Sequence, residues 1–237
     1  MAVTFDFWNT LVCTRSSGTR DARRAAIGAE LADLGHDVDD AALDVALDRA
    51  VAVFEERWRA NRQFAAVDGA LVVVDSLDLP LGASERQRLV DAFVDSASDL
   101  SPELTPGAAD TLRTLSDADV RLGIICDVGL TPSPVLRRYL DRQGVLELFD
   151  HWSFSDEVGT YKPDPGIFAH ALGGLGDAEA SRSVHVGDLR RTDVAGGRTA
   201  GMVTVRYTGR HDDPDAGPEA DVVLDDLGRL ASLLGLG

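Results

Sequence analysis

The chain has 237 residues and a mass of 25.3 kDa, enough for one large α/β domain or for a core domain with a smaller insert. Its 40 acidic and 23 basic side chains give a net charge of −17, which argues against nucleic acid and anionic membranes as partners. No apolar run approaches the roughly 20 residues of a membrane-spanning helix. The N-terminus has neither the basic region nor the long apolar stretch of a signal peptide. The two cysteines do not make a disulfide framework, so a cytoplasmic protein is expected.

The first predicted element is a short buried strand over residues 3–7, which delivers polar groups at its C-terminal end. From about residue 16 to residue 100 apolar residues recur at helical spacing, and no strand pattern is obvious. We interpret these apolar stripes as ordinary core packing and predict a four-helix insert. The insert would form a helical domain over residues 15–101, and residues 1–14 and 102–237 would form the core domain.

After residue 107 helical and strand patterns alternate, which is typical of parallel βαβ units with right-handed crossovers. The predicted fold class is therefore α/β, with a Rossmann-like parallel sheet and an inserted four-helix domain. The segment 209–220 is rich in Asp, Pro and Gly and predicts a surface loop. Strands are predicted at 121–126, 152–155, 183–187, 202–206 and 221–224, and helices at about 108–116, 132–143, 165–172, 192–200 and the C-terminus.

Polar side chains follow four of the predicted strands, at the point where each strand ends. Ligands of parallel sheets bind beyond the carboxyl ends of the strands. If these strands are neighbours, several carboxylates and one ammonium group therefore converge on one crevice. The residues are Asp6, Trp8, Asn9 and Thr10 after the first strand, Cys126 and Asp127 at the second, Lys162 after the third, and Gly187, Asp188 and Asp193 at the fourth.

The predicted crevice has the chemistry of a metal-assisted site. Asp6 and Asp188 would repel each other unless a cation lay between them, and hard oxygen ligands favour Mg²⁺. A carboxylate beside a bound metal can attack an electrophile such as phosphorus. Lys162, the only lysine of the chain, would neutralise phosphoryl oxygens and restrain the nucleophile.

Together these segments resemble the haloacid dehalogenase superfamily of Asp-nucleophile hydrolases over essentially the full chain. Each motif alone is weak, but four of them in this order at strand ends are highly specific. The helical insert is similar to the α-helical cap that closes over the active site in that family. The matching segments are 5–11 (FDFWNTL), 124–127 (IICD), 162–164 (KPD) and 187–193 (GDLRRTD), the last in the Gly-Asp-x4-Asp form.

The resemblance implies a role for each matching position. Asp6 would be the nucleophile that becomes a covalent aspartyl intermediate, and Lys162 would hold Asp6 and the transferring group. Mg²⁺ would be bound by Asp6, the backbone carbonyl of Trp8 and Asp188, with Asp193 in support. Cys126 and Asp127 would flank the transferring group, Thr10 would be a supporting hydroxyl, and Asn9 is a candidate for substrate binding.

Two positions depart from the family pattern. Phosphatases of the superfamily usually have a second Asp, the general acid and base, where this chain has Trp8. Indole cannot move protons at neutral pH, and losing a general acid typically costs about 10²–10⁴ in rate. We therefore expect a slow phosphatase of a small phosphorylated metabolite, or one restricted to good leaving groups, with Asp127 or a cap residue as a candidate proton donor. Cys126 stands where the family normally has Ser or Thr, and a thiol is a weaker donor.

Two alternatives remain open. Relatives that cleave carbon–halogen bonds carry an aromatic residue at the position of Trp8 and work without metal, so a metal-independent 2-haloacid dehalogenase is the second hypothesis. It needs a cationic halide cradle, for which Arg15, Arg20, Arg23 and Arg24 are candidates. The third hypothesis is a non-catalytic binding protein on the same fold.

The expected partner is a small, phosphorylated molecule, and the oligomeric state is open. Excess aspartate with a single lysine resembles proteins of salt-loving archaea, in which high salt screens the repulsion between surface charges. Candidates for substrate selection in the insert, by bulk or charge alone, are Arg57, Trp58, Arg59 and Arg62.

Overall fold

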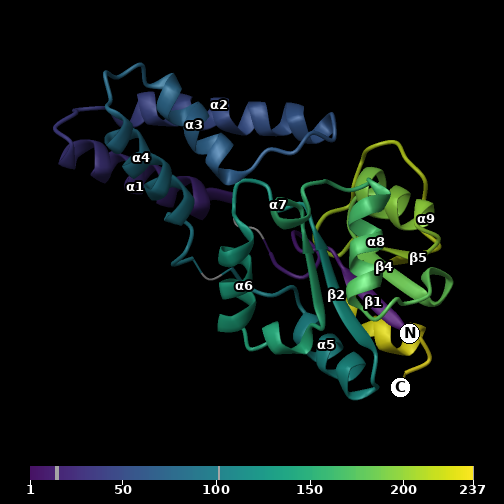
Figure 1. Cartoon of the computed structure of the whole chain (residues 1–237). Coiled ribbons are helices and arrows are strands. Elements are labelled where there is room, and N and C mark those ends of the chain that lie inside the picture. The colour runs from purple at the N-terminus through teal and green to yellow at the C-terminus, as the bar shows by residue number, and fades with distance from the viewer. Residues whose placement is uncertain (14–15, 101, 237) are drawn as a thin grey trace. The chain divides into compact units, whose positions relative to one another are not determined.

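The computed structural model describes residues 1–13, 16–100 and 102–236. These residues divide into two compact units (Figure 1). The first unit comprises residues 1–13, 102–127 and 140–236, and the second comprises residues 16–100 and 128–139. The sequence assigns 128–139 to the core domain, and the division into domains that it suggests stays a prediction.

The first unit contains a six-stranded sheet in the order β3-β2-β1-β4-β5-β6, in which every neighbouring pair is parallel. The predicted α/β class is confirmed. The central strands are buried along almost their whole length, as expected for a parallel sheet covered on both faces. The strands are β1 (Ala2–Phe5), β2 (Arg121–Cys126), β3 (His151–Phe154), β4 (Ser183–Gly187), β5 (Val203–Tyr207) and β6 (Val222–Leu224).

Helices connect these strands. α5 (Ala108–Asp117) packs on β2 and on α10 (Leu230–Leu233), whereas α8 (Pro165–Gly174) packs on β2, β3 and α9 (Ala195–Thr199). α8 begins with a proline at its first position, and the Asp164 side chain accepts a hydrogen bond from the Gly166 amide. The apolar side chains Ile167 and Phe168 of α8 pack against Ile125 of β2.

Two local features differ from the sequence prediction. A short helix, α7 (Ser155–Val158), follows β3 directly and carries too few residues to show a helical period. The helix expected at 192–200 is preceded by a single π-helical turn, Arg190–Val194. In that turn the Asp193 carboxylate accepts a hydrogen bond from the Leu189 amide, which folds the turn back on itself.

Residues 16–100 of the second unit form four helices, as the periodicity predicts. Their apolar faces share one core, which includes Leu43, Val73, Leu89 and Phe93. Side chains cap the helix starts, for example Asp39 on the Ala42 amide. The helices are α1 (Ser16–Asp33), α2 (Asp40–Arg59), α3 (Ala66–Ser76) and α4 (Ala83–Asp95).

The segment 128–139 belongs to this helical core. Leu130 packs among the buried residues of the helices, and a Cβ on Gly69 would lie 2.6 Å from Leu130 Cδ2. Tyr139, on α6 (Ser133–Arg142), donates a hydrogen bond of 2.5 Å to the Ala97 carbonyl. The chain thus returns to the helical unit directly after Asp127, the residue that follows β2.

In the part of the chain that the structure describes, no helix is both long and apolar enough to cross a membrane.

Candidate active site

The strand order brings three of the predicted strand ends together. β1 lies between β2 and β4, and Phe5 pairs with both Ile124 and Val186. The Asp6 amide continues this ladder with a 2.8 Å hydrogen bond to the Val186 carbonyl. Asp6 is therefore fixed directly beyond the end of β1, between the residues that follow β2 and β4.

Lys162 joins two of the predicted acidic residues. Its Nζ lies 2.5 Å from Asp6 Oδ1 and 2.6 Å from Asp193 Oδ1, and its side chain is 2% exposed. The Lys162 amide donates a 2.9 Å hydrogen bond to Asp127 Oδ1, so Asp127 holds the backbone that carries the ammonium group. Burial alone would lower the pKa of Lys162, but Asp193 and Asp6 outweigh burial and raise that pKa well above its usual value.

Three buried carboxylates form a candidate metal site. Asp6, Asp188 and Asp193 each place one oxygen within 4.8 Å of the others. Burial, together with the neighbouring carboxylates, raises the pKa of Asp6 to about 7 and that of Asp188 to about 9. Burial acts on Asp193 in the same direction, but Lys162 and then His185 outweigh it and hold the pKa of Asp193 below its usual value. One ammonium group therefore compensates three crowded acids only in part.

His185 is a functional candidate that the sequence analysis missed. It lies on β4 and is fully buried, with Nε2 3.1 Å from Asp193 Oδ1 and Nδ1 2.9 Å from Thr4 Oγ1. Burial lowers its pKa, so the ring is neutral near pH 7. In that state Nε2–H donates to Asp193 and Nδ1 accepts from Thr4. A polar residue inside an apolar strand was the available signal, because such a residue needs partners when buried.

His211 is a second residue that the sequence did not indicate. Its Nδ1 lies 3.0 Å from Asp188 Oδ2, and the ring is partly exposed. The loop that carries it follows β5 and is tied down by Arg190, whose amide donates to Asp213 Oδ2 at 2.7 Å and whose side chain donates to Glu219 Oε2 at 2.9 Å. Arg190 thus holds the loop that places His211.

Gly187 explains the glycine of the Gly-Asp-x4-Asp motif. A Cβ at this position would lie 2.2 Å from Asp193 Cγ. Only a residue without a side chain therefore lets Asp193 return to the end of β4, where it meets Lys162 and His185.

The loop after Asp6 contains the other predicted residues. Trp8 is half-buried, and its ring meets Phe7 edge-on with 4.9 Å between centroids. Asn9 has a left-handed backbone (φ 58°), which this residue type tolerates well. Thr10 is fully buried, and its hydroxyl has no hydrogen-bond partner among the described residues. This hydroxyl is therefore available to form a hydrogen bond with a bound group.

Cys126 is fully buried at the end of β2. Burial, and then the nearby Asp6, raise the pKa of its thiol well above the usual value. The thiol therefore stays protonated at neutral pH and acts as a weak donor, not as a nucleophile.

The remaining arginine and tryptophan candidates that the structure describes lie in the helical unit. Arg20 and Arg24 are hydrogen-bonded to Asp44, and Arg23 is buried. Arg57, Arg59 and Arg62 are exposed and Trp58 is half-buried, whereas Arg15 lies outside the described residues.

The donor set fits the Mg²⁺ that the resemblance implies. It consists of carboxylate oxygens alone, which are hard ligands suited to Mg²⁺. Burial, together with the neighbouring carboxylates, raises the pKa values of Asp6 and Asp188, and a divalent cation between them would stabilise their charged forms. Asp193 already accepts hydrogen bonds at both oxygens, from Lys162 and His185 at one and from Leu189 at the other. Asp6 and Asp188 therefore offer the freer oxygens.

The sequence matches a known family and several characterised relatives. Residues 1–201 match the model described as haloacid dehalogenase-like hydrolase. A pyrimidine 5′-nucleotidase of Escherichia coli is 31% identical over 150 residues, which are 63% of this chain and 64% of that protein. A glyceraldehyde 3-phosphate phosphatase of Methanopyrus kandleri is 30% identical over 98% of this chain and 95% of its own length. A ribulose-1,5-bisphosphate 5-phosphatase of Halopiger xanaduensis is 28% identical over 98% of both chains.

Solved structures give the same picture. A phosphatase of this family from Thermococcus onnurineus aligns with a TM-score of 0.66 and 26% identity, covering 99% of this chain and 98% of its own. A 2-haloacid dehalogenase from Pseudomonas syringae aligns with a TM-score of 0.69 and 25% identity, covering 99% of both chains. The fold is thus shared by enzymes that cleave two different kinds of bond.

Proposed function

The chain belongs to the haloacid dehalogenase-like hydrolases, and we propose that it is a Mg²⁺-dependent phosphatase of small phosphorylated metabolites. The observation that carries this proposal is the buried Lys162 between Asp6 and Asp193, with Asp188 beside them. The names of the relatives, which act on a nucleotide or on sugar phosphates, support the substrate class. In this proposal the helical unit is the cap, and the enzyme acts in the cytoplasm.

The proposed reaction uses Asp6 as the nucleophile. An Asp6 oxygen bonds to phosphorus while the bond from phosphorus to the leaving oxygen breaks, which leaves an aspartyl phosphate. Water then attacks that phosphorus, releases inorganic phosphate and restores the carboxylate. Mg²⁺, when bound by Asp6, Asp188 and the Trp8 carbonyl, would supply positive charge to the phosphoryl oxygens.

Lys162 has two tasks in this scheme. Its ammonium group fixes one oxygen of Asp6, which leaves the other oxygen free to attack. The same charge stabilises the phosphoryl oxygens in the transition state. The buried Thr10 hydroxyl has no hydrogen-bond partner among the described residues, and we assign it as a donor to the transferring group.

Trp8 limits the rate that we expect for substrates with poor leaving groups. No proton donor occupies the position two residues after Asp6, so an alkoxide would leave without protonation from that position. We therefore propose slow turnover, or a preference for substrates whose leaving group is already a stable anion.

A metal-independent 2-haloacid dehalogenase remains the second candidate. Trp8 favours it, because a departing halide needs no proton, and the Pseudomonas syringae dehalogenase shares the fold at 25% identity. The cluster of three carboxylates counts against it, because metal-free chemistry does not require them. Halide release from 2-chloropropionate in the presence of EDTA would establish this alternative. Metal binding without turnover of either substrate class would favour the non-catalytic hypothesis.

The first test is hydrolysis of para-nitrophenyl phosphate in molar KCl, with and without Mg²⁺. Phenolate leaves with little need of an acid, so the test does not depend on Trp8. We expect turnover that requires Mg²⁺ and is lost in the isosteric variant Asp6→Asn. Asp110→Asn is the matched control, because Asp110 is an exposed carboxylate on α5. Turnover that survives Asp6→Asn, or none in a folded wild-type protein that binds Mg²⁺, contradicts the proposal.

The natural substrate class can then be narrowed with a small panel. A pyrimidine nucleoside monophosphate, glyceraldehyde 3-phosphate and ribulose 1,5-bisphosphate represent the activities named for the relatives. Phosphate release should be compared at equal concentration, with Asp6→Asn as the background for each compound.

A further inference from the structure

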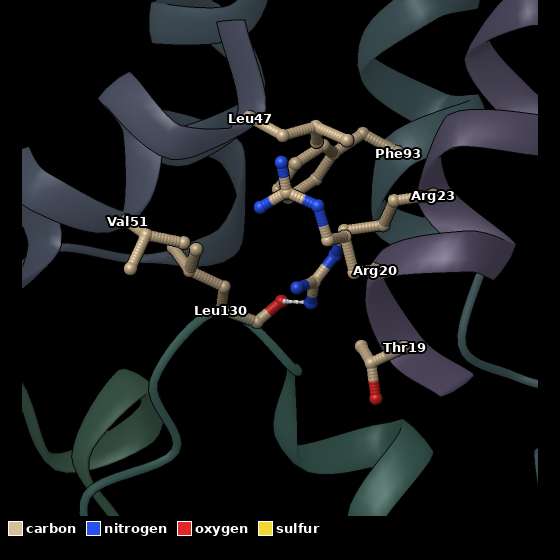
Figure 2. A pocket seen from close by; sticks show the side chains of 7 residues that line it. All are labelled: Thr19, Arg20, Arg23, Leu47, Val51, Phe93 and Leu130. Atoms are coloured by element: carbon tan, nitrogen blue, oxygen red, sulfur yellow. Dashed lines mark hydrogen bonds between the residues drawn. The ribbon is translucent and has the colours of Figure 1, made fainter. Parts of the chain in front are cut away.

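A cavity of about 340 Å³ lies within the helical unit alone (Figure 2). Its volume falls at the lower end of the range for small-molecule sites. Val51, at 40% exposed, leaves the cavity open to solvent on one side, whereas Leu47, Phe93 and Leu130 are buried. The full lining consists of Thr19, Arg20, Arg23, Leu47, Val51, Phe93 and Leu130.

Arg23 is the unusual member of this lining. The residue is 8% exposed, and its guanidinium carbon lies 4.7 Å from the centre of the Phe93 ring. Its Nη2 donates hydrogen bonds to the Leu130 carbonyl at 2.5 Å and to Thr131 Oγ1 at 3.3 Å. Its Nε is buried and has no partner among the described residues. The described residues also provide no carboxylate that forms an ion pair with it.

Unlike Arg23, the neighbouring arginines of α1 form ion pairs with carboxylates. Arg20 also lines the cavity, but Asp44 and Asp48 bind its guanidinium group. Arg24 lies outside the lining and pairs with Asp21 and Asp44. The chain has 40 acidic side chains, yet none of those described compensates Arg23.

A buried and uncompensated guanidinium group is costly, because it has lost its water without gaining an opposite charge. Burial lowers the pKa of Arg23 to about 10, which still leaves the group cationic at neutral pH. The aromatic ring and one carbonyl compensate the charge only in part. An oxyanion that reached the free Nε would complete the compensation with a charge-assisted hydrogen bond.

We propose that Arg23 and this cavity bind the oxyanion, carboxylate or phosphate, of a small molecule with an apolar body. The guanidinium group takes the anion, and Leu47, Val51 and Leu130 contact the apolar part. The site is built by the helical unit alone and does not depend on the proposed phosphatase activity. It gives the cap a defined anion receptor, which is a means of selecting ligands by a charged group.

The main alternative is a purely structural role, in which Arg23 only fastens the 128–139 segment to α1 and α4. The two roles predict different behaviour toward anions. If Arg23 is structural, replacing it leaves the affinity of the protein for anions unchanged. If Arg23 binds the anion, replacing it lowers that affinity.

The test is calorimetric titration of the full chain with inorganic phosphate, isobutyrate and bromide in separate experiments, with EDTA present and chloride held constant. We expect phosphate or isobutyrate to bind the wild type. Arg23→Met should weaken that binding by about tenfold or more, the loss of one charge-assisted contact. The matched control Arg24→Met removes the same charge one residue away and should bind like the wild type. Phosphate bound elsewhere, for example near Asp6, is recognised because it persists in Arg23→Met.

A second variant keeps the test decisive if Arg23→Met does not fold. Val51→Phe fills the mouth of the cavity and leaves Arg23 in place, and we expect it to weaken isobutyrate binding. Preference for phosphate or for isobutyrate would identify the source of the oxyanion. Absence of oxyanion binding to the wild type, equal binding to Arg23→Met, or binding of bromide alone would overturn the proposal.

Discussion

At the scale of single residues, the proposed site depends on how three carboxylates share the positive charge of one ammonium group. Lys162 is bound to Asp6 and Asp193, so its charge is already divided when a substrate arrives. Asp193 is further held by His185, whereas the side chain that the described residues place against Asp188 is the partly exposed His211. The least compensated carboxylate is therefore Asp188, and it is the one whose pKa is raised to about 9.

Trp8 gives the sharpest prediction at this scale. Trp8→Asp would restore a carboxyl group two residues after Asp6, where it could protonate a leaving alkoxide. We expect the rate for an alkyl phosphate such as glycerol phosphate to rise about 10²-fold or more. The rate for para-nitrophenyl phosphate should change much less, because phenolate needs no proton. The ratio of the two kcat/KM values measures this effect.

Trp8→Asn is the control for that experiment, since it opens the same space without an acid. It should leave the ratio unchanged. An equal loss on both substrates in a folded Trp8→Asp variant would show that the indole is needed for packing beside Phe7, and would contradict the role given to the missing acid.

The central residues of the site could be predicted because strand ends in a parallel sheet meet at one edge. Asp6, Lys162, Asp188 and Asp193 follow this rule, and the structure brings them together. His185 and His211 could not be predicted in the same way. His185 lies inside a strand, and its role requires knowing that Asp193 folds back toward it. His211 depends on the path of an irregular loop, which no short-range pattern encodes.

At the scale of elements, the strands were predictable within one or two residues, because apolar runs bounded by polar residues mark buried parallel strands. The helices of the insert were predictable from their apolar period. The π-helical turn at Arg190–Val194 was not, because it forms around a local hydrogen bond from the Leu189 amide to the Asp193 side chain, which the spacing of apolar residues does not reveal. The segment 209–220 was identified as a loop, but the contacts of Arg190 and Arg206 that hold it were not.

Arg206 on β5 is the main tie between the sheet and this loop. Its buried guanidinium donates to Glu219 Oε1 and to Asp212 Oδ1, both at 2.7 Å. Arg206→Met should make amide hydrogen exchange faster in peptides that cover 208–220 and lower the free energy of unfolding. We expect about 1–2 kcal/mol, because both acids are largely exposed and their pairing is screened. Hydrogen-exchange mass spectrometry and urea unfolding measure the two effects.

The matched control is Arg229→Met, which removes an exposed arginine paired with exposed Asp225. It should leave exchange in 208–220 unchanged. Unaltered protection of that loop in Arg206→Met would show that the Arg190 contacts alone hold it, and that Arg206 is not the tie we describe.

At the scale of the whole molecule, charge and stability are linked. The net charge of −17 favours expansion at low salt, and salt screens this repulsion over distances beyond about 10 Å at 0.1 M. The buried carboxylates of the first unit are screened much less. Their contribution to stability should therefore appear as a dependence on pH and on Mg²⁺, even in molar KCl.

Between pH 7 and pH 8.5 the dependence of stability on pH comes mainly from Asp188, with a smaller part from Asp6, whose pKa is raised to about 7. In this range the described histidines with shifted pKa values, His151 and His185, are neutral in the folded protein, where their pKa values are lowered, and largely neutral in the unfolded chain, where the pKa is 6.5. Asp188 has a pKa raised to about 9 on folding, from 3.8. The folded protein thus holds a proton that the unfolded chain has lost, and stability falls as pH rises through this range. Asp193 has the opposite shift, so its contribution is complete here and is lost only in acid.

We therefore expect the free energy of unfolding in EDTA to fall by about 2 kcal/mol between pH 7 and pH 8.5, at roughly 1.4 kcal/mol per pH unit for one proton. Mg²⁺ should stabilise the protein more at pH 8.5 than at pH 7, because it binds the ionised carboxylates and its binding releases protons. Urea unfolding in molar KCl, with EDTA or with Mg²⁺, measures both effects.

Asp188→Asn should flatten the slope in EDTA and remove most of the stabilisation by Mg²⁺. A slope that Asp188→Asn leaves intact, or an equal gain from Mg²⁺ at both pH values, would place the titrating group and the cation elsewhere in the molecule.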